Sequence, residues 1–493
     1  MKKTGIVPTR IENYSEWYQQ VIRAADLAEN SPVRGCMVIK PWGYQLWETL
    51  HDKLDAEFKA TGHKNAYFPL FIPVSFLQKE AEHVEGFAKE CAVVTHSRLQ
   101  LNDEHQLIPT SPLDEPLIVR PTSETIIGEA FSRWIHSYRD LPLLINQWAN
   151  VVRWEMRTRL FLRTSEFLWQ EGHTAHATAE EAREETLRML EVYRHIIEDE
   201  LAIPTLIGEK PASERFPGAV ATYTLEGMMQ DRKALQLGTS HFLGQNFAKA
   251  MQIKFVDAQG QECYAWTSSW GVTTRLIGAL IMTHSDDDGL ILPPNIANMH
   301  AVILPIIHDE SRRNEIENYC QQLKFQLQQQ AWRSSLQVEI DHRDLRGGEK
   351  RWQWIKKGVC CLIEIGASEV DNKTATITWR DLLQKEVLPI QNFIGTFTTG
   401  LQSMQQRLWE KAQAYRDQAV KRVESQEEFY SFFKKEGGFA LTYWSEDPVI
   451  EAKIKEELKV TVRCIPQKFI QETGPCLFTQ KQDCHLAVFA KSY

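Results

Sequence analysis

The alternation of hydrophobic and polar positions changes character near residue 295. Before that point most strands follow one another through short turns, a pattern that favours a mixed, mainly antiparallel sheet in an α+β fold. Apolar residues spaced three or four positions apart indicate helices that pack on this sheet. The predicted helices cover residues 14–28, 43–61, 121–138, 179–201 and a segment from 272, and the predicted strands cover 35–40, 65–73, 117–120, a hairpin at 146–176, 234–241 and 263–269.

Beyond residue 300 strands and helices alternate regularly, which predicts a small α/β domain. Residues 74–117 show mixed patterning and are expected to loop over the surface. A charged helix at about 401–422 leads into a last small α/β module. The chain is therefore expected to form three parts, residues 1–295, 296–405 and 406–493. In the second part the predicted strands are 301–307, 336–340, 360–365 and 374–379, and the predicted helices are 310–330 and 350–357.

Length and composition support a folded protein of several domains. A chain of 493 residues is too long for one ordinary hydrophobic core, and 43% hydrophobic with 25% charged residues is typical of folded soluble proteins. The first residues contain no apolar run that could serve as a signal peptide or membrane span, so we expect a cytoplasmic protein without a membrane partner. Nine scattered cysteines, with Cys360 and Cys361 adjacent in an apolar stretch, suit reduced thiols in a core.

The net charge of -9 and the isoelectric point near 6.0 argue weakly against nucleic acid. A local basic surface remains compatible with this balance. The segment 343–357 either forms such a surface or is a solvated charged face, and its sequence alone does not separate these two readings. Its basic residues are Arg343, Arg346, Lys350, Arg351, Lys356 and Lys357.

The hairpin at 146–176 carries the densest group of charged residues with chemical potential. On its first arm Arg153, Glu155 and Arg157 alternate with apolar residues, so a strand would place all three on one face. Opposite charges on facing strands are often only cross-strand pairs on a wet sheet, and that reading stays open for this hairpin alone. The return arm carries Arg163, Thr164, Trp169, Glu171 and His173.

Two further polar groups occur at the ends of predicted elements. Thr122 and Glu124 begin a helix, where they either cap it or hold an ammonium group. Gln236, Thr239 and His241 end a strand, where side chains can point into a cleft, although a lone histidine there is often structural.

Arg275 is the residue whose purely structural interpretation is weakest. An arginine at the start of a helix opposes the helix dipole, and it is better explained by an anion or a stacked base. Gly347-Gly348-Glu349-Lys350 lacks the spacing of a phosphate-binding loop, and no strand is followed by Gly-x-Gly-x-x-Gly. A bound nucleotide would therefore be held by guanidinium groups on a sheet.

Taken together, these groups resemble a class II aminoacyl-tRNA synthetase, specifically a prolyl-tRNA synthetase of the archaeal and eukaryotic-like type. The resemblance runs from about Tyr14 to Tyr493. Residues 35–73, 151–164 and 268–275 resemble the first, second and third motifs of the class. The stretches specific to the prolyl branch are 120–125, 167–173 and 235–241.

The resemblance implies that proline and ATP form an aminoacyl adenylate and that the acyl group passes to the 3′ end of proline tRNA. Arg153 and Arg275 would be the catalytic residues, with Arg153 bridging the proline carboxylate and the α-phosphate. Proline would be bound by Thr122, Glu124, Arg153, Trp169, Glu171, His173, Phe216 and His241. ATP would be bound by Arg153, Glu155, Arg163, Thr164, Gln236, Thr239 and Arg275, with Mg²⁺ on its phosphates.

The resemblance also implies a class II catalytic domain at 1–295, an anticodon-binding domain at 296–405, and a linker helix with a C-terminal extension at 406–493. The basic residues Arg343, Arg346, Lys350 and Arg351 would then contact tRNA. The interval 176–268 is too short for the large editing insertion of the bacterial-like branch, so no editing in cis is expected. A homodimer is expected from the first motif.

Relatives often bind structural zinc in this extension through four cysteines. Here 437–449, where the first pair would fall, contains no cysteine, and the remaining Cys464, Cys476 and Cys484 lack a close Cys-x-x-Cys pair. We expect no structural zinc and no other resident metal. The alternatives are a catalytically silent paralogue that binds tRNA and a ligase that passes its adenylate to a protein or cofactor. Neither motif arginine is missing, which argues against the first.

Overall fold

The computed structural model describes residues 5–78, 91–332 and 335–493. Within these ranges the central element is a twelve-stranded sheet. Neighbouring strands of this sheet are antiparallel, except for the outermost pair at each of its two edges. The mixed, mainly antiparallel sheet is therefore confirmed. The strands that carry the site are β7 (Leu143–Val152), β8 (Glu166–His176), β9 (Thr205–Glu209), β10 (Ala221–Met228), β11 (Ala234–Gly244) and β14 (Trp266–Thr273), with β3 (Lys64–Asn65) at the edge and β12 (Lys254–Val256) and β13 (Glu262–Tyr264) as a separate pair.

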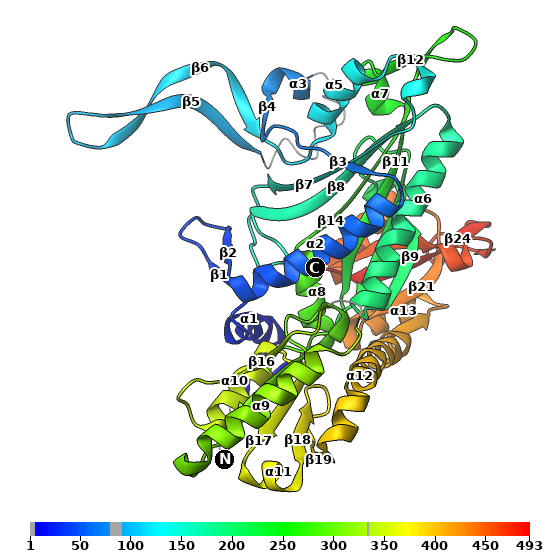
Figure 1. Cartoon of the computed structure of the whole chain (residues 1–493). Coiled ribbons are helices and arrows are strands. Elements are labelled where there is room, and N and C mark those ends of the chain that lie inside the picture. The colour runs from blue at the N-terminus through cyan, green and yellow to red at the C-terminus, as the bar shows by residue number, and fades with distance from the viewer. Residues whose placement is uncertain (1–4, 79–90, 333–334) are drawn as a thin grey trace.

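Helices lie against this sheet close to their predicted places (Figure 1). Residues 14–28 are not one helix, because α1 ends at Ala24 and Ala28 opens a short strand. Residues 196–200 form a π-helical turn directly after α6 (Ala179–His195). The helices are α1 (Tyr14–Ala24), α2 (Pro41–Ala60), α5 (Glu124–Trp134), α6 (Ala179–His195), α7 (Asn246–Ala250) and α8 (Arg275–His284), and the short strand pair is β1 (Ala28–Asn30) with β2 (Met37–Ile39).

The prediction of a loop at 74–117 is wrong for most of its described residues. β5 (Ala92–Leu101) and β6 (Leu107–Val119) form a long antiparallel hairpin that projects from the body of the molecule (Figure 1). Much of this hairpin is exposed on both faces, so its sequence lacks the alternation that marks a half-buried strand. The predicted strand 65–73 is also divided, with β4 (Phe71–Pro73) joining this hairpin, and α3 (Val74–Gln78) following it. Residues 79–90 lie outside the described part.

The second part is the predicted α/β domain. Its sheet has the order β16-β15-β17-β18-β19, with β15 parallel to both of its neighbours and the last two strands antiparallel. The elements are β15 (Ala301–Pro305), α9 (Arg313–Gln328), β16 (Val338–Ile340), α10 (Gly347–Lys357), β17 (Cys361–Ile365), α11 (Ala367–Asn372), β18 (Thr374–Trp379) and β19 (Lys385–Pro389).

The linker helix α12 (Ile390–Gln418) begins earlier than predicted and leads into the last part. There, the strands do not form an isolated sheet, because β22 pairs with β9 and so extends the central sheet. The elements are β20 (Val420–Arg422), α13 (Gln426–Lys435), β21 (Phe439–Trp444), α14 (Pro448–Leu458), β22 (Val460–Pro466), β23 (Thr473–Gly474) and β24 (Cys484–Lys491).

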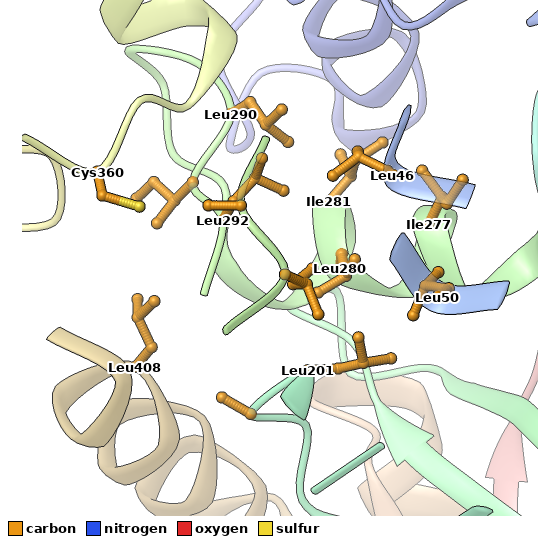
Figure 2. Packing of buried hydrophobic residues seen from close by; sticks show 14 of the residues in the cluster. Leu46, Leu50, Leu201, Ile277, Leu280, Ile281, Leu290, Leu292, Cys360 and Leu408 are labelled. Atoms are coloured by element: carbon orange, nitrogen blue, oxygen red, sulfur yellow. The ribbon is translucent and has the colours of Figure 1, made fainter. Parts of the chain in front are cut away.

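One continuous apolar cluster joins the first two parts. Leu46 on α2 and Leu280 on α8 belong to the same cluster as Leu290, Cys360 in the second domain and Leu408 on α12 (Figure 2). All five side chains are almost completely removed from solvent. Burial of so much apolar area fixes the second domain against the base of the first. Among the described residues, no helix has an apolar stretch long enough to cross a bilayer.

Candidate active site

Strand geometry alone brings two rows of polar side chains onto one face of the central sheet. On β8, Trp169, Glu171 and His173 alternate and therefore share a face. On β11, Thr239 and His241 also share a face, but Gln236 has the opposite parity. The register against β10 shifts between Gly238 and Gln236, and this bulge turns Gln236 to the same side. All of these residues line one cavity.

The group at the start of α5 is not an ordinary helix cap. Ser123 occupies the N-cap position without making a side-chain capping bond. Its hydroxyl instead donates to Glu171 Oε1 at 2.5 Å, and the Thr122 hydroxyl donates to Glu124. Glu124 is only 8% exposed. A nearly buried carboxylate that faces the cavity is suited to a cationic ligand, so the geometry favours the ammonium-binding interpretation.

Glu171 lies at the centre of a buried hydrogen-bond network. His173 Nε2 lies 2.9 Å from its Oε2, and Gln147 Nε2 donates to its Oε1 at 2.8 Å. Burial raises the pKa of Glu171, but the hydrogen bond and charge of His173, followed by the bonds from Ser123 and Gln147, leave it below its ordinary value. Burial likewise lowers the pKa of His173, and Glu171 outweighs this to raise it. The two residues therefore form an ion pair in the wall of the cavity.

A second, neutral histidine stands across the cavity. Burial, followed by the charges of His173 and Lys210, lowers the pKa of His241 to about 3. Its ring lies 4.6 Å from the Phe216 ring, centroid to centroid. Thr222 joins the two, because its Oγ1 accepts from the Phe216 backbone N–H at 3.1 Å and lies 3.0 Å from His241 Nδ1.

Arg153 occupies the middle of the cavity but not as predicted. β7 ends at Val152, so the alternation of 153, 155 and 157 on a strand face is wrong, and these residues lie in the connecting loop. Arg153 Nε donates to the Pro121 carbonyl at 3.0 Å, and its guanidinium carbon lies 5.4 Å from the Trp169 ring centroid. Arg157 is exposed and does not line the cavity.

Arg275 closes the other end of the cavity. Burial, followed by the charges of Arg163 and Arg153, lowers its pKa to about 10. Its Nη1 donates weakly to the Gln236 carbonyl at 3.4 Å, and its buried Nε has no acceptor within the described part of the chain. Arg153 and Arg163 are thus close enough to Arg275 for their like charges to act on it, and three neighbouring guanidinium groups that line one cavity are suited to an anionic ligand.

The predicted proline and ATP residues therefore converge on one cavity of about 460 Å³. Sequence patterns missed several other residues that line it, because Lys210 and Thr222 show their position only once β9 and β10 are paired. The predicted lining residues are Thr122, Glu124, Arg153, Glu155, Arg163, Thr164, Trp169, Glu171, His173, Phe216, Gln236, Thr239, His241 and Arg275, and the missed ones include Phe161, Phe167, Lys210, Glu214, Arg215 and Thr222.

The basic residues proposed to contact tRNA lie in the second domain and outside this cavity. Arg343 and Arg346 are exposed, although Arg343 also pairs with Asp341 at 2.7 Å. Lys350 is buried and donates to the Asp341 carbonyl at 3.0 Å. Arg351 is half-buried beside Glu364. Lys350 thus anchors α10 rather than presenting its charge to solvent, whereas Arg351 keeps a partly exposed side chain.

Comparison with known families agrees with this architecture. The model of the tRNA synthetase class II core domain (G, H, P, S and T) matches residues 106–284. The model of the anticodon binding domain matches residues 300–399, and that of the prolyl-tRNA synthetase C-terminal domain matches residues 426–493. Fold and site together are those of a class II aminoacyl-tRNA synthetase.

Individual relatives identify the family of this chain within the class. The proline–tRNA ligase of Protochlamydia amoebophila is 57% identical over 100% of this chain and 99% of its own, and that of Rhodopirellula baltica is 56% identical over 100% and 98%. A prolyl-tRNA synthetase from Cryptosporidium parvum, solved with halofuginone and AMPPNP, superposes with a TM-score of 0.91 at 36% identity over 99% of both chains. The chain belongs to the prolyl-tRNA synthetase family.

Proposed function

We propose that the cleft joins L-proline to ATP as prolyl-adenylate and then transfers the prolyl group to the 3′ end of proline tRNA, as a proline–tRNA ligase. The observation that carries the proposal is the division of one cavity into two halves. Glu124 and the Glu171–His173 pair lie at one end, and Arg163 and Arg275 lie toward the other. Arg153 lies between them, because it bonds to Pro121 next to Thr122 and its charge also acts on Arg275. A cationic and an anionic ligand would meet at Arg153.

In the first half, Thr122 and Glu124 would bind the secondary ammonium of proline. Trp169, His173, Phe216 and His241 would enclose its ring, since aromatic and imidazole faces form a small, partly apolar pocket. Glu171 would act through His173, whose orientation it fixes. Larger amino acids would be excluded by overlap.

At the reacting centre, a proline carboxylate oxygen attacks the α-phosphorus, and the bond to the bridging oxygen breaks to release pyrophosphate. Arg153 would touch both the carboxylate and the α-phosphate, which offsets charge that builds on the phosphoryl oxygens. Catalysis of this kind depends mainly on positioning and neutralisation. Arg275 would stack on the adenine or neutralise the distal phosphates.

The remaining cavity residues would orient the nucleotide. Glu155, Arg163 and Thr164 would hold the adenine side, and Gln236 and Thr239 the ribose or the metal. Gln236 and Thr239 line the cavity with oxygen-bearing side chains, which fits Mg²⁺ carried in by ATP. Bound there, Mg²⁺ would neutralise phosphate charge.

We also propose domain limits of 1–295, 296–405 and 406–493, and assignment to the archaeal and eukaryotic-like type. The enzyme would work as a homodimer in the cytoplasm, where it would charge tRNA for protein synthesis. The short interval between 176 and 268 supports the type and the absence of editing in cis. Arg343 and Arg346 are the exposed candidates for tRNA contact. Cysteine spacing supports an extension without structural zinc.

The assay that tests the proposal is proline-dependent exchange between ATP and pyrophosphate together with charging of proline tRNA. Both activities are expected. Exchange without charging would indicate a ligase with another acceptor, and the absence of both would indicate a silent paralogue. The relatives and the intact cavity give no support to the silent alternative.

A sharper test removes the central cation. Arg153→Ala is expected to abolish exchange, a loss of at least about a thousandfold, because a preorganised charge at the developing oxyanion is removed. Arg157→Ala is the matched control, since Arg157 belongs to the same loop but is exposed outside the cavity. Near-normal exchange by Arg153→Ala would remove Arg153 from the reacting centre.

A further inference from the structure

A buried ion cluster connects the C-terminal part of the chain to the floor of the cleft. Glu226 on β10 is fully buried. Arg463 on β22 donates to its carboxylate from Nε at 3.1 Å and from Nη2 at 3.0 and 3.2 Å. Lys210 lines the cavity and donates from Nζ to the same carboxylate at 3.2 Å. The Thr224 hydroxyl also donates to it, at 2.9 Å.

Glu226 also lies next to the ATP half of the cavity. It is the cross-strand partner of Gln236, and the Gln236 carbonyl is the weak acceptor of Arg275. Arg275 Nε, buried and lacking an acceptor in the described residues, would bond readily to any carboxylate that came within reach. Glu226 is also close enough for its charge to act on Arg275, where it raises the pKa against the effect of burial.

The charges of the cluster favour this arrangement. Burial raises the pKa of Glu226, but the charges of Arg463 and Lys210 outweigh it and keep the group ionised. Glu226 is thus a buried anion beside a cavity in which the phosphates of the proposed ATP would require positive charge. Without Arg463, it would keep only Lys210 and Thr224 as donors, and a buried carboxylate with lost partners recruits new ones.

We propose that Arg463 is a positioning residue for ATP: by holding the Glu226 carboxylate together with Lys210, it leaves Arg275 directed into the cleft. The C-terminal extension is then a working part of the active site and not only an appended module. This inference rests on the proposed function of the cleft.

Two neighbouring contacts between the same parts of the chain support the assignment. β22 pairs with β9 at Gly208 and Glu209, immediately before Lys210. The loop that follows Lys210 also lines the cavity. A second contact holds this loop, because the Ser213 hydroxyl donates to Glu451 on α14 at 3.0 Å. The C-terminal part therefore restrains the chain on both sides of Lys210.

The test is Arg463→Met in the full-length enzyme, followed by ATP–pyrophosphate exchange. KM for ATP is expected to rise about tenfold, the effect of losing one hydrogen bond to a charged group, while KM for proline changes by less than about twofold. Adding Glu226→Gln is expected to reverse most of the rise, because a neutral amide no longer attracts Arg275. Arg463→Lys, which keeps the charge but not the two-point contact, should be intermediate.

The matched control is Arg232→Met, which removes a 2.8 Å contact to Glu436 between the same two parts at the surface. It should leave both KM values unchanged. An unchanged KM for ATP in Arg463→Met, or a rise that Glu226→Gln does not reverse, would overturn the inference and leave Arg463 a structural residue. Absence of exchange in the unmodified enzyme would instead contradict the proposed function.

Discussion

At the scale of single residues, Thr222 shows how a hydroxyl that need not touch substrate can determine a pocket. It lies below Phe216 and His241 and bonds to both, one through a backbone N–H and the other through an imidazole nitrogen. His241 is neutral, since burial lowers its pKa to about 3. A neutral imidazole presents one donor and one acceptor, and the Thr222 contact selects which nitrogen faces the proposed proline pocket.

Thr222→Val keeps the shape of the side chain but removes both contacts. Each unsatisfied buried group costs about 1–3 kcal/mol, so KM for proline is expected to rise about tenfold while KM for ATP stays near normal. Thr222→Ser restores the hydroxyl and should recover most of the affinity. Both constants come from pyrophosphate exchange. Equal increases in the two KM values would show a general structural defect and contradict this role.

Most of the predicted lining residues came from the resemblance to class II synthetases. Local spacing alone accounts for a part of them, because Trp169, Glu171 and His173 share a strand face whatever the rest of the fold does. Arg153 was assigned to the right place by a wrong argument, since it lies in a loop and not on a strand. Lys210 and Lys350 could not be judged in this way. Lys210 lines the cavity but bonds to Glu226, and Lys350, on α10, is buried against the Asp341 carbonyl; neither contact follows from the pattern of a single strand or helix.

At the scale of elements, the contact between β9 and β22 depends on a glycine. A Cβ at Gly208 would lie 2.4 Å from the Ile465 carbonyl and 2.7 Å from Cys464 Sγ. Both atoms belong to the facing strand, so that strand would have to move. Only a residue without a side chain allows this close approach.

Gly208→Ala is therefore expected to loosen β22 from β9. Amide hydrogen exchange at residues 460–466 should become faster, and the temperature of unfolding should fall, since the overlap involves backbone and not a flexible side chain. Gly395→Ala on α12 is the control, because nothing lies within 4 Å of its added Cβ and alanine favours a helix. Exchange at 460–466 as slow as in the unmodified protein would contradict the prediction.

The elements that the sequence did not predict are those whose position leaves no local pattern of burial. Strong periodicity predicted α2 and α6 well, as it reports burial along a single element. The β5–β6 hairpin was missed because its faces are both largely exposed, and the sheet extension through β22 was missed because pairing between strands more than two hundred residues apart leaves no local pattern.

At the scale of the whole molecule, the folded chain keeps several histidines neutral in its interior. Burial is the main cause in each, and it lowers the pKa to about 3 for one and to about 4 for the others. They are spread over both parts that share the continuous apolar cluster, so acid should weaken the assembly as a unit. These residues are His63, His176, His241, His284 and His300.

Protonation of these histidines favours the unfolded chain. Because their folded pKa values lie below the ordinary 6.5, the unfolded state binds more protons as pH falls, and stability present above pH 6.5 is lost progressively toward pH 4. Each fully shifted group contributes up to about 1.4 kcal/mol per pH unit in that window. His173, with its raised pKa, has the opposite sign: its contribution is complete below pH 6.5 and is lost as pH rises through its folded pKa.

The urea midpoint of unfolding should therefore stay nearly level from pH 7.5 to about pH 6.5 and then fall toward pH 5.5, at constant ionic strength. His284→Gln should make that fall shallower, because the amide can still donate to the Leu201 carbonyl, which lies 2.8 Å from His284 Nε2, but takes up no proton. The replacement is not expected to raise the midpoint at neutral pH, where His284 is already uncharged. The slope of the midpoint against pH is the informative quantity. A midpoint that stayed level or rose toward pH 5.5 would mean that these histidines do not govern the acid response.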